Sequence, residues 1–287
     1  MDSDIARSVR RSRAVRSVLW GAGLLILGGL ATTAFGAVPA TTVSSTTVVA
    51  SHTSKGLAAL NATDAQGLSQ EDLAGLYTTA INEFIEALKD SPKDYSALMG
   101  KGRLHLKTGE AEDALAEFVK AVAVRRDAGT LQWLAVASLH AGRLDDALLY
   151  AREILTLNAR STVARDTLAS VAFRRKDWRG AIAEWEKVFP HSPDPHMILT
   201  NIASAQEGLG EYDRALESIR RSIAINSRYA SAYFERGVIY QKMGRFKEAK
   251  AALMRAVELA PAADNFREGL REVEDMERSS KSDGERP

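Results

Sequence analysis

Alanine recurs along this chain at a nearly constant interval. Spacings of 34, 33, 34, 34 and 34 residues separate Ala80, Ala114, Ala147, Ala181, Ala215 and Ala249. Four residues after each alanine stands an apolar side chain, large in all units but one: Phe84, Phe118, Ala151, Trp185, Ile219 and Leu253. Self-similarity at 34 residues is typical of stacked helix-turn-helix repeats. The pattern predicts an array of units that contact only their neighbours, rather than one globular core.

The unit over residues 230–263 shows the predicted geometry best. Gly244 is expected to end its first helix, because glycine readily adopts a positive φ. Pro261 is expected to end its second helix, because proline cannot continue one. Gly237 on the first helix and Ala249 on the second have little or no side chain, so the two backbones can approach closely.

The same features recur in register through the four preceding units. Each first helix carries a small residue, at Gly102, Ala135, Ala169, Ala203 and Gly237. The turn holds a glycine in four units, at Gly109, Gly142, Gly210 and Gly244, and Lys176 stands there in the third unit. This pattern resembles the tetratricopeptide repeat family. The resemblance implies an all-α, right-handed α-solenoid of five stacked repeats, at residues 95–127, 128–161, 162–195, 196–229 and 230–263.

Shorter elements are predicted to close both ends of the array, as terminal units of solenoids require. Residues 69–93 are predicted to form one capping helix, or half repeat, because the residues upstream lack the apolar face of a first helix. Ser69 and Asp72 have the spacing of a helix N-cap. Residues 264–277 combine apolar and charged side chains at helical spacing, which predicts a solvated C-terminal cap. Residues 278–287 are expected to be disordered.

The first 40 residues have the features of a targeting segment, the one apolar helix expected before the array. Residues 1–16 contain five arginines and are predicted to be a basic cytoplasmic segment. Residues 17–40 contain no charged residue and include 21 consecutive apolar and small side chains, enough for a transmembrane anchor. A cleaved signal peptide is the alternative, because an apolar core can end at Leu30 with small residues following it. Residues 41–68, rich in Ser and Thr, are predicted to be a linker.

Both alternatives place the repeats outside the cytoplasm. The protein is expected to be a single-pass membrane protein with periplasmic repeats, or a cleaved protein that is secreted or periplasmic. The chain has no cysteine, which excludes disulfides, thiolate chemistry and acylation as a bacterial lipoprotein. Its 38 Lys and Arg nearly balance its 37 Asp and Glu, and no basic stripe for nucleic acid is apparent.

No catalytic or cofactor-binding motif is evident. The sequence lacks a glycine-rich phosphate loop and a nucleophile elbow. His191, Asp194 and His196 form the one cluster with metal-ligand chemistry, in the loop between the third and fourth units. The prolines of this loop are explained more simply by the end of one helix and the start of the next. We expect no enzyme activity, metal, cofactor or small-molecule substrate.

Binding is the activity that the architecture predicts. In the family that the chain resembles, side chains of the first helices line a concave groove, and Trp133 and Phe234 are the expected anchors. The Lys and Asn set by which some members hold a peptide carboxylate is not recognisable, since Asn201 stands alone. The predicted partner-binding residues are Arg103, Lys107, Gln132, Trp133, His140, Asp166, Arg174, Asn201, Glu207, Phe234, Glu235 and Lys242.

The sequence therefore predicts a non-catalytic scaffold or adaptor for a protein or peptide partner. Export and the family resemblance imply a role in assembly of a bacterial envelope complex. The alternatives are a chaperone-like holdase for exported clients and an accessory subunit of an envelope enzyme. A scaffold predicts one stoichiometric partner, whereas a holdase predicts broad, weak binding of apolar peptides.

Overall fold

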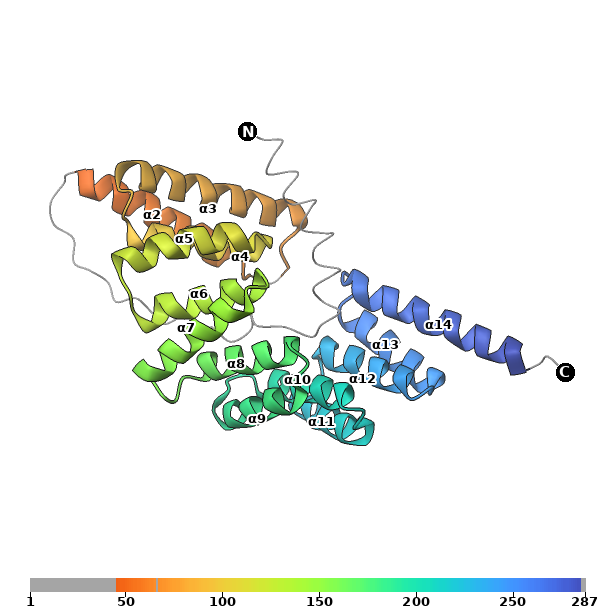
Figure 1. Ribbon diagram of the computed structural model, residues 1–287. Helices are drawn as coiled ribbons and strands as arrows, with labels where there is room; N and C mark the ends of the chain where they lie inside the picture. The colour runs from red at the N-terminus through yellow and green to blue at the C-terminus, as the bar shows by residue number, and fades with distance from the viewer. Residues whose placement is uncertain (1–44, 66, 285–287) are drawn as a thin grey trace. The chain divides into compact units, whose positions relative to one another are not determined.

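The structure is a computed structural model that describes residues 45–65 and 67–284. Over these residues the chain forms α-helices and one 3-10 helix, with no strand (Figure 1). They fall into two compact units that divide within α8, after Thr167. The first unit contains α2 (Ser45–Ala62), α3 (Gln70–Asp90), α4 (Tyr95–Thr108), α5 (Ala111–Val124), α6 (Ala128–His140), α7 (Leu144–Leu157) and the beginning of α8 (Thr162–Arg174). The second contains the rest of α8, α9 (Trp178–Val188), η2 (Phe189–His191), α10 (Pro195–Gly208), α11 (Tyr212–Ile225), α12 (Ala230–Lys242), α13 (Phe246–Leu259) and α14 (Asp264–Gly284).

Helix pairs follow one another through both units. In the first unit α2 packs on α3, α4 on α5 and α6 on α7, and in the second unit α10 packs on α11 and α12 on α13. Residues of α8 beyond Thr167 pack on α9, where Ala169, Ala181 and Trp185 share one buried cluster. Trp185 is 1% exposed, as expected of a core residue. The all-α repeat array predicted from the 34-residue period is confirmed.

The repeating positions lie where the two helices of a pair touch. All six alanines of the 34-residue interval are fully buried, and the side chains four residues further on are at most 1% exposed. A Cβ added to Gly102 would lie 2.5 Å from Cε1 of Phe118, and one added to Gly237 would lie 2.6 Å from Cγ of Leu253. Both distances are shorter than a carbon–carbon contact allows. These glycines therefore permit the close approach that the sequence predicted.

The turns adopt the backbone conformation expected of a helix C-terminus. The four predicted turn glycines all have positive φ, between 72° at Gly244 and 84° at Gly109. Lys176 has φ 61° and occupies the same left-handed region without the freedom of glycine. A side chain in this region costs about 1 kcal/mol. The third turn thus keeps the shape of the others despite an unfavourable residue.

The N-terminal end differs from the prediction of a linker over residues 41–68 and a lone capping helix over residues 69–93. Helix α2 packs on α3 and also contacts α4. The ring of Phe84, on α3, lies between two glycines. A Cβ added to Gly56 on α2 would lie 2.7 Å from this ring, and one added to Gly100 on α4 would lie 2.3 Å from it. Helices α2 and α3 therefore form a complete pair before the five predicted ones.

A longer connection explains why the regular period did not reveal this pair. Gly56 precedes Phe84 by 28 residues, whereas Gly102 precedes Phe118 by 16. The additional residues lie in the turn after α2 and in α3, which has 21 residues against 14 in α5. A first helix displaced in this way cannot be found with a fixed 34-residue interval.

The start of α3 agrees with the prediction. The backbone N–H of Asp72 donates to Ser69 Oγ at 3.0 Å, and the backbone N–H of Ser69 donates to Asp72 Oδ2 at 3.1 Å. These reciprocal bonds form a capping box. The hydrogen bonds from Ser69 also lower the pKa of Asp72. The N-cap predicted from two residues is confirmed.

Helix α14 closes the second unit and is longer than predicted. Phe266 and Val273 are buried, and α14 contacts both α12 and α13. Its backbone stays helical as far as Gly284, so most of the predicted disordered tail, residues 278–287, is helix instead. Pairs at i, i+3 and i, i+4 support this extension: Arg278 binds Asp275, and Ser279 Oγ donates to the Asp275 carbonyl.

The predicted basic segment and the predicted anchor or signal segment, residues 1–16 and 17–40, lie outside the described residues. Among the helices that the structure describes, none is long and apolar enough to cross a membrane. The location of the protein stays a prediction from the sequence.

Candidate partner-binding surfaces

The predicted partner-binding residues all lie on the first helices of their pairs. In the first unit α4 contacts both α2 and α6, and in the second unit α10 contacts α12, so first helices adjoin within each unit. We call the residues on α4, α6 and the start of α8 the first-unit set: Arg103, Lys107, Gln132, Trp133, His140 and Asp166. We call those on the end of α8, α10 and α12 the second-unit set: Arg174, Asn201, Glu207, Phe234, Glu235 and Lys242.

Trp133 lies at the boundary between the buried core of the first unit and its surface. Its ring stacks on Phe118, with centroids 5.9 Å apart and an interplanar angle of 28°. The guanidinium carbon of Arg103 lies 5.4 Å from the Trp133 ring centroid. Trp133 is partly exposed, so it both packs against α5 and presents a cation–π contact. Trp133 therefore packs against the core of its unit, and its predicted role as a surface anchor stays a prediction.

Arg103 is held in an unfavourable environment. It is partly buried, and among the residues that the structure describes its Nε has no hydrogen-bond partner. Burial lowers the pKa of Arg103, and the nearby Asp64 carboxylate opposes this change. The same Asp64, in the turn after α2, pairs with Lys107. Sequence reasoning missed Asp64 because its segment was interpreted as a linker.

The remaining members of the first-unit set are partly buried. Gln132 and His140 come from α6 and Asp166 from α8. All three residues are partly exposed. A role in partner binding for these residues stays a prediction.

Two residues of the second-unit set, Asn201 and Phe234, are less accessible to a partner than predicted. Asn201 is 7% exposed and belongs to the buried residues of α10. Phe234 stacks on Phe266 of α14, with ring centroids 4.9 Å apart and planes 28° apart. The reason is that α14 packs on α12 and uses this ring in the interface. The structure therefore explains Phe234 mainly by packing, and its predicted role as an anchor is not needed to account for it.

Glu235 has the most perturbed carboxyl group of the second-unit set. Burial raises its pKa, Glu207 raises it further and a hydrogen bond from Ser204 lowers it, and the resulting pKa is about 7. Glu207 Oε1 lies 3.9 Å from Lys242 Nζ, at the limit of an ion pair. Arg174 is partly buried, and burial lowers its pKa. The second-unit set therefore places two carboxylates close together and a solvated lysine beside one of them.

The histidine loop predicted as a possible metal site has another arrangement. His191 is exposed on η2. The ring of His196 meets the ring of Tyr229 edge to face at 4.7 Å, and His196 Nε2 lies 3.3 Å from Asn226 Nδ2. Burial lowers the pKa of His196, and Asp194 opposes this change. These contacts connect His196 to the start of α12 rather than to His191.

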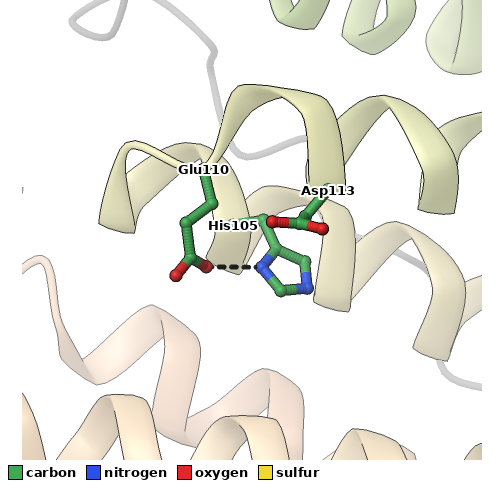
Figure 2. A group of neighbouring side chains, drawn as sticks. All are labelled: His105, Glu110 and Asp113. Atoms are coloured by element: carbon green, nitrogen blue, oxygen red, sulfur yellow. Dashed lines mark hydrogen bonds and ion pairs between the residues drawn. The ribbon is translucent and has the colours of Figure 1, made fainter. Parts of the chain in front are cut away.

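Three possible metal ligands do come together in the turn between α4 and α5. Figure 2 shows His105 with Glu110 and Asp113, whose ligand atoms lie within 4.8 Å of one another. His105 Nδ1 lies 2.7 Å from Glu110 Oε2, and Thr108 Oγ1 donates to the same oxygen at 3.0 Å. The cluster lies at the N-terminus of α5, where the helix dipole disfavours a cation. Hydrogen bonds within the turn account for the positions of His105 and Glu110.

Comparison with known proteins gives matches inside both units. Models described as "Tetratricopeptide repeat" match residues 66–130 and 230–262, and a model described as "TPR repeat" matches residues 209–244. Small glutamine-rich tetratricopeptide repeat-containing protein 2 of Mycosarcoma maydis is 27% identical over 111 residues, which cover 39% of this chain. The match spans 32% of that relative, and matches to two further curated relatives span 5% and 21% of their lengths.

Solved structures share the fold. A tetratricopeptide repeat protein from Parabacteroides merdae ATCC 43184 has a TM-score of 0.62 at 19% identity, covering 78% of this chain and 92% of that one. A thermophilic TPR protein of Thermus thermophilus has a TM-score of 0.57 at 20% identity, covering 62% of this chain and 98% of that one. Tetratricopeptide repeat models thus match residues in both units, and the described helices share their fold with solved tetratricopeptide repeat proteins.

Proposed function

We propose that this protein is a non-catalytic scaffold that binds a protein or peptide partner on its first helices. Tetratricopeptide repeat proteins generally mediate protein–protein interactions. The observation that carries the proposal is Arg103, a partly buried guanidinium beside Trp133 whose Nε lacks a hydrogen-bond partner among the described residues. Arginine and tryptophan are the residue types enriched at the energetic centres of interfaces.

The energetic cost of burying Arg103 is better explained by a role in partner binding than by a role in folding. A buried polar group without a hydrogen bond costs about 1–3 kcal/mol, so Arg103 lowers the stability of the unbound protein. A carbonyl or carboxylate oxygen of a partner would satisfy the guanidinium and exclude water from the Trp133 ring. The charged side chains of both sets favour one complementary partner over the unfolded apolar chains that a holdase binds.

Replacement of Arg103 tests this proposal. Arg103→Met keeps the aliphatic contact with Trp133 but removes the charge and its donors. We expect binding of the native partner to weaken about tenfold or more, while the free energy of unfolding stays equal or rises by up to about 1 kcal/mol. Photo-crosslinking from α4 in intact cells, followed by mass spectrometry, identifies the partner and compares its yield between variants.

The matched control is Arg152→Met, which changes an exposed arginine on the second helix α7. Its crosslinking yield is expected to equal that of the unmodified chain. A partner retained at full yield by Arg103→Met would show that this residue does not bind it. Chemical denaturation of both variants separates lost binding from lost folding.

We further infer that the scaffold acts outside the cytoplasm, in assembly of a bacterial envelope complex. Five arginines precede an uncharged apolar stretch, an asymmetry that favours export of the residues after it. Residues 17–40 would attach the repeats to the membrane as a single-pass anchor, or would be removed as a signal peptide. The absence of cysteine is compatible with either fate.

A further inference from the structure

The first unit already holds a carboxylate on its candidate partner-binding surface. Asp64 lies in the turn after α2, and its Oδ1 accepts a hydrogen bond from Nζ of Lys107 on α4. The backbone N–H of Asp64 donates to the carbonyl oxygen of Asn61 at 3.1 Å, which fixes the turn. The ion pair joins residues 43 positions apart in the sequence, so it brings a carboxylate from another element to the first-unit set.

Lys107 and Arg103 form one basic face of α4. They are four residues apart in this helix, so their side chains are neighbours along it. The guanidinium carbon of Arg103 lies 5.4 Å from the Trp133 ring centroid, and its Nε has no hydrogen-bond partner among the described residues. Two cations therefore share this face, whereas Asp64 forms its ion pair with Lys107 alone.

The two members of this ion pair differ in their exposure to water. The Lys107 side chain is 23% exposed, but that of Asp64 is 61% exposed. An ion pair with so exposed a member contributes little to stability, because water screens the charges and the side chains lose entropy. A carboxylate presented by a partner could form the same charge-assisted hydrogen bond to Lys107, while Asp64 returns to water. Exchange of one carboxylate for another would leave Lys107 paired throughout.

We propose that this face of α4 binds an acidic side chain of the partner, and that Asp64 is an internal competitor for the same place. The proposal rests on the scaffold function, because the acidic residue belongs to the partner of that scaffold. The carboxylate that occupies the face is an aspartate side chain, which favours an acidic side chain over a C-terminal carboxylate as the ligand. Occupation by Asp64 lowers the apparent affinity for the partner, because only molecules with a free Lys107 are ready to bind.

Selection from a library of random dodecapeptides, displayed on phage and panned on the full chain, tests the ligand chemistry. Fusion of each peptide to the coat protein through its C-terminus leaves only side-chain carboxylates. We expect the selected peptides to share aspartate or glutamate at one position. Lys107→Met removes the ammonium but keeps an aliphatic side chain, and it is expected to weaken binding of a selected peptide about tenfold or more.

Asp64→Asn tests the competition, because it keeps the size of the side chain and removes its charge. We expect this variant to bind a selected peptide about three- to tenfold more tightly than the unmodified chain. Most of this gain should disappear in the double variant with Lys107→Met, since the two residues act on each other. The matched control is Asp90→Asn, on an exposed aspartate at the end of α3, which is expected to bind like the unmodified chain.

Urea denaturation of each variant separates a change in binding from a change in folding. Selected peptides without a shared acidic residue, or full affinity of Lys107→Met, would overturn the inference. An affinity of Asp64→Asn no higher than that of Asp90→Asn would do so too, as would failure to select any peptide. The scaffold function is decided separately, by crosslinking of the native partner to Arg103→Met.

Discussion

Burial moves the pKa of Arg103 downward and that of Glu235 upward, in both cases toward the neutral form. The two side chains belong to different units, yet each is a charged group that folding alone does not favour. The six alanines of the repeat interval are the opposite case, because their burial defines the contact between helices. At the scale of residues, the positions that hold the stack and the positions proposed to bind a partner are chemically distinct.

The raised pKa of Glu235 has a consequence for stability. Its pKa is about 7 in the folded protein and about 4.5 in the unfolded chain, so the folded protein holds more protons between these values. The free energy of unfolding should therefore fall as pH rises through this window. Glu235→Gln removes the effect. We expect the variant to match the unmodified chain at pH 4.5 and to exceed it by about 1–2 kcal/mol at pH 8, since partial exposure reduces the full shift.

Denaturant unfolding at a series of pH values measures this difference. Glu268→Gln, on an exposed glutamate of α14, serves as the control, and its stability relative to the unmodified chain should not change over the same range. A stability difference between Glu235→Gln and the unmodified chain that is independent of pH would mean that the Glu235 carboxyl ionises normally.

At the scale of elements, α2 packs closely against the ring of Phe84. Because an added Cβ on Gly56 meets the ring at 2.7 Å, the contact leaves no room for a larger residue on α2. A Cβ added to Gly75, on α3, would meet no atom beyond the adjacent backbone of its own helix within 4 Å, so Gly75 provides a matched site. Both glycines lie in helices, but only Gly56 packs against an aromatic ring. Comparing substitutions at the two sites therefore distinguishes the effect of packing from that of helix propensity.

Alanine substitution at these two sites should have opposite effects. Gly75→Ala is expected to stabilise the protein by about 0.5–1 kcal/mol, because alanine favours a helix over glycine. Gly56→Ala is expected to destabilise it by about 1–3 kcal/mol through overpacking. Urea denaturation compares the two. Equal stabilisation by both variants would contradict the packing of α2 on Phe84.

The sequence predicted the regular elements well and the irregular ones poorly. A fixed interval located the helix pairs from Tyr95 to Leu259, because each repeats the same contact between small and large residues. It failed at α2, where a longer turn breaks the interval. The capping box of Ser69 and Asp72 was predicted correctly, because its hydrogen bonds join residues only three positions apart in the sequence. The candidate surfaces were predicted only in part, since burial of Asn201 and coverage of Phe234 by α14 depend on tertiary packing.

At the scale of the whole molecule, the two units carry first-helix surfaces of mixed charge. The first-unit set contains Arg103, Lys107 and Asp166, and the second-unit set contains Arg174, Lys242, Glu207 and Glu235. A partner that engages both sets needs both acceptors and donors. Such a requirement favours recognition of one partner over general binding of apolar chains.

Export of the whole array is tested by a topology reporter. Alkaline phosphatase, which is active only outside the cytoplasm, is fused after Pro287, and a green fluorescent protein fusion at the same site reports the opposite location. We expect an active phosphatase, and loss of its activity when Arg7, Arg10, Arg11, Arg13 and Arg16 are replaced by glutamate. Activity confined to the cytoplasmic reporter would exclude an extracytoplasmic scaffold.

Helix α14 also affects whether copies of the protein can associate end to end. A row of similar units has two different ends, and if each end fits the other, copies add head to tail without limit. Helix α14 occupies the place of a next first helix, through Phe266 and Val273 on its inner side. Its outer side presents Arg271, Glu272 and Asp275 to solvent. The outer side of α14 therefore presents mainly charged side chains, and we do not expect copies to add to it through an apolar contact.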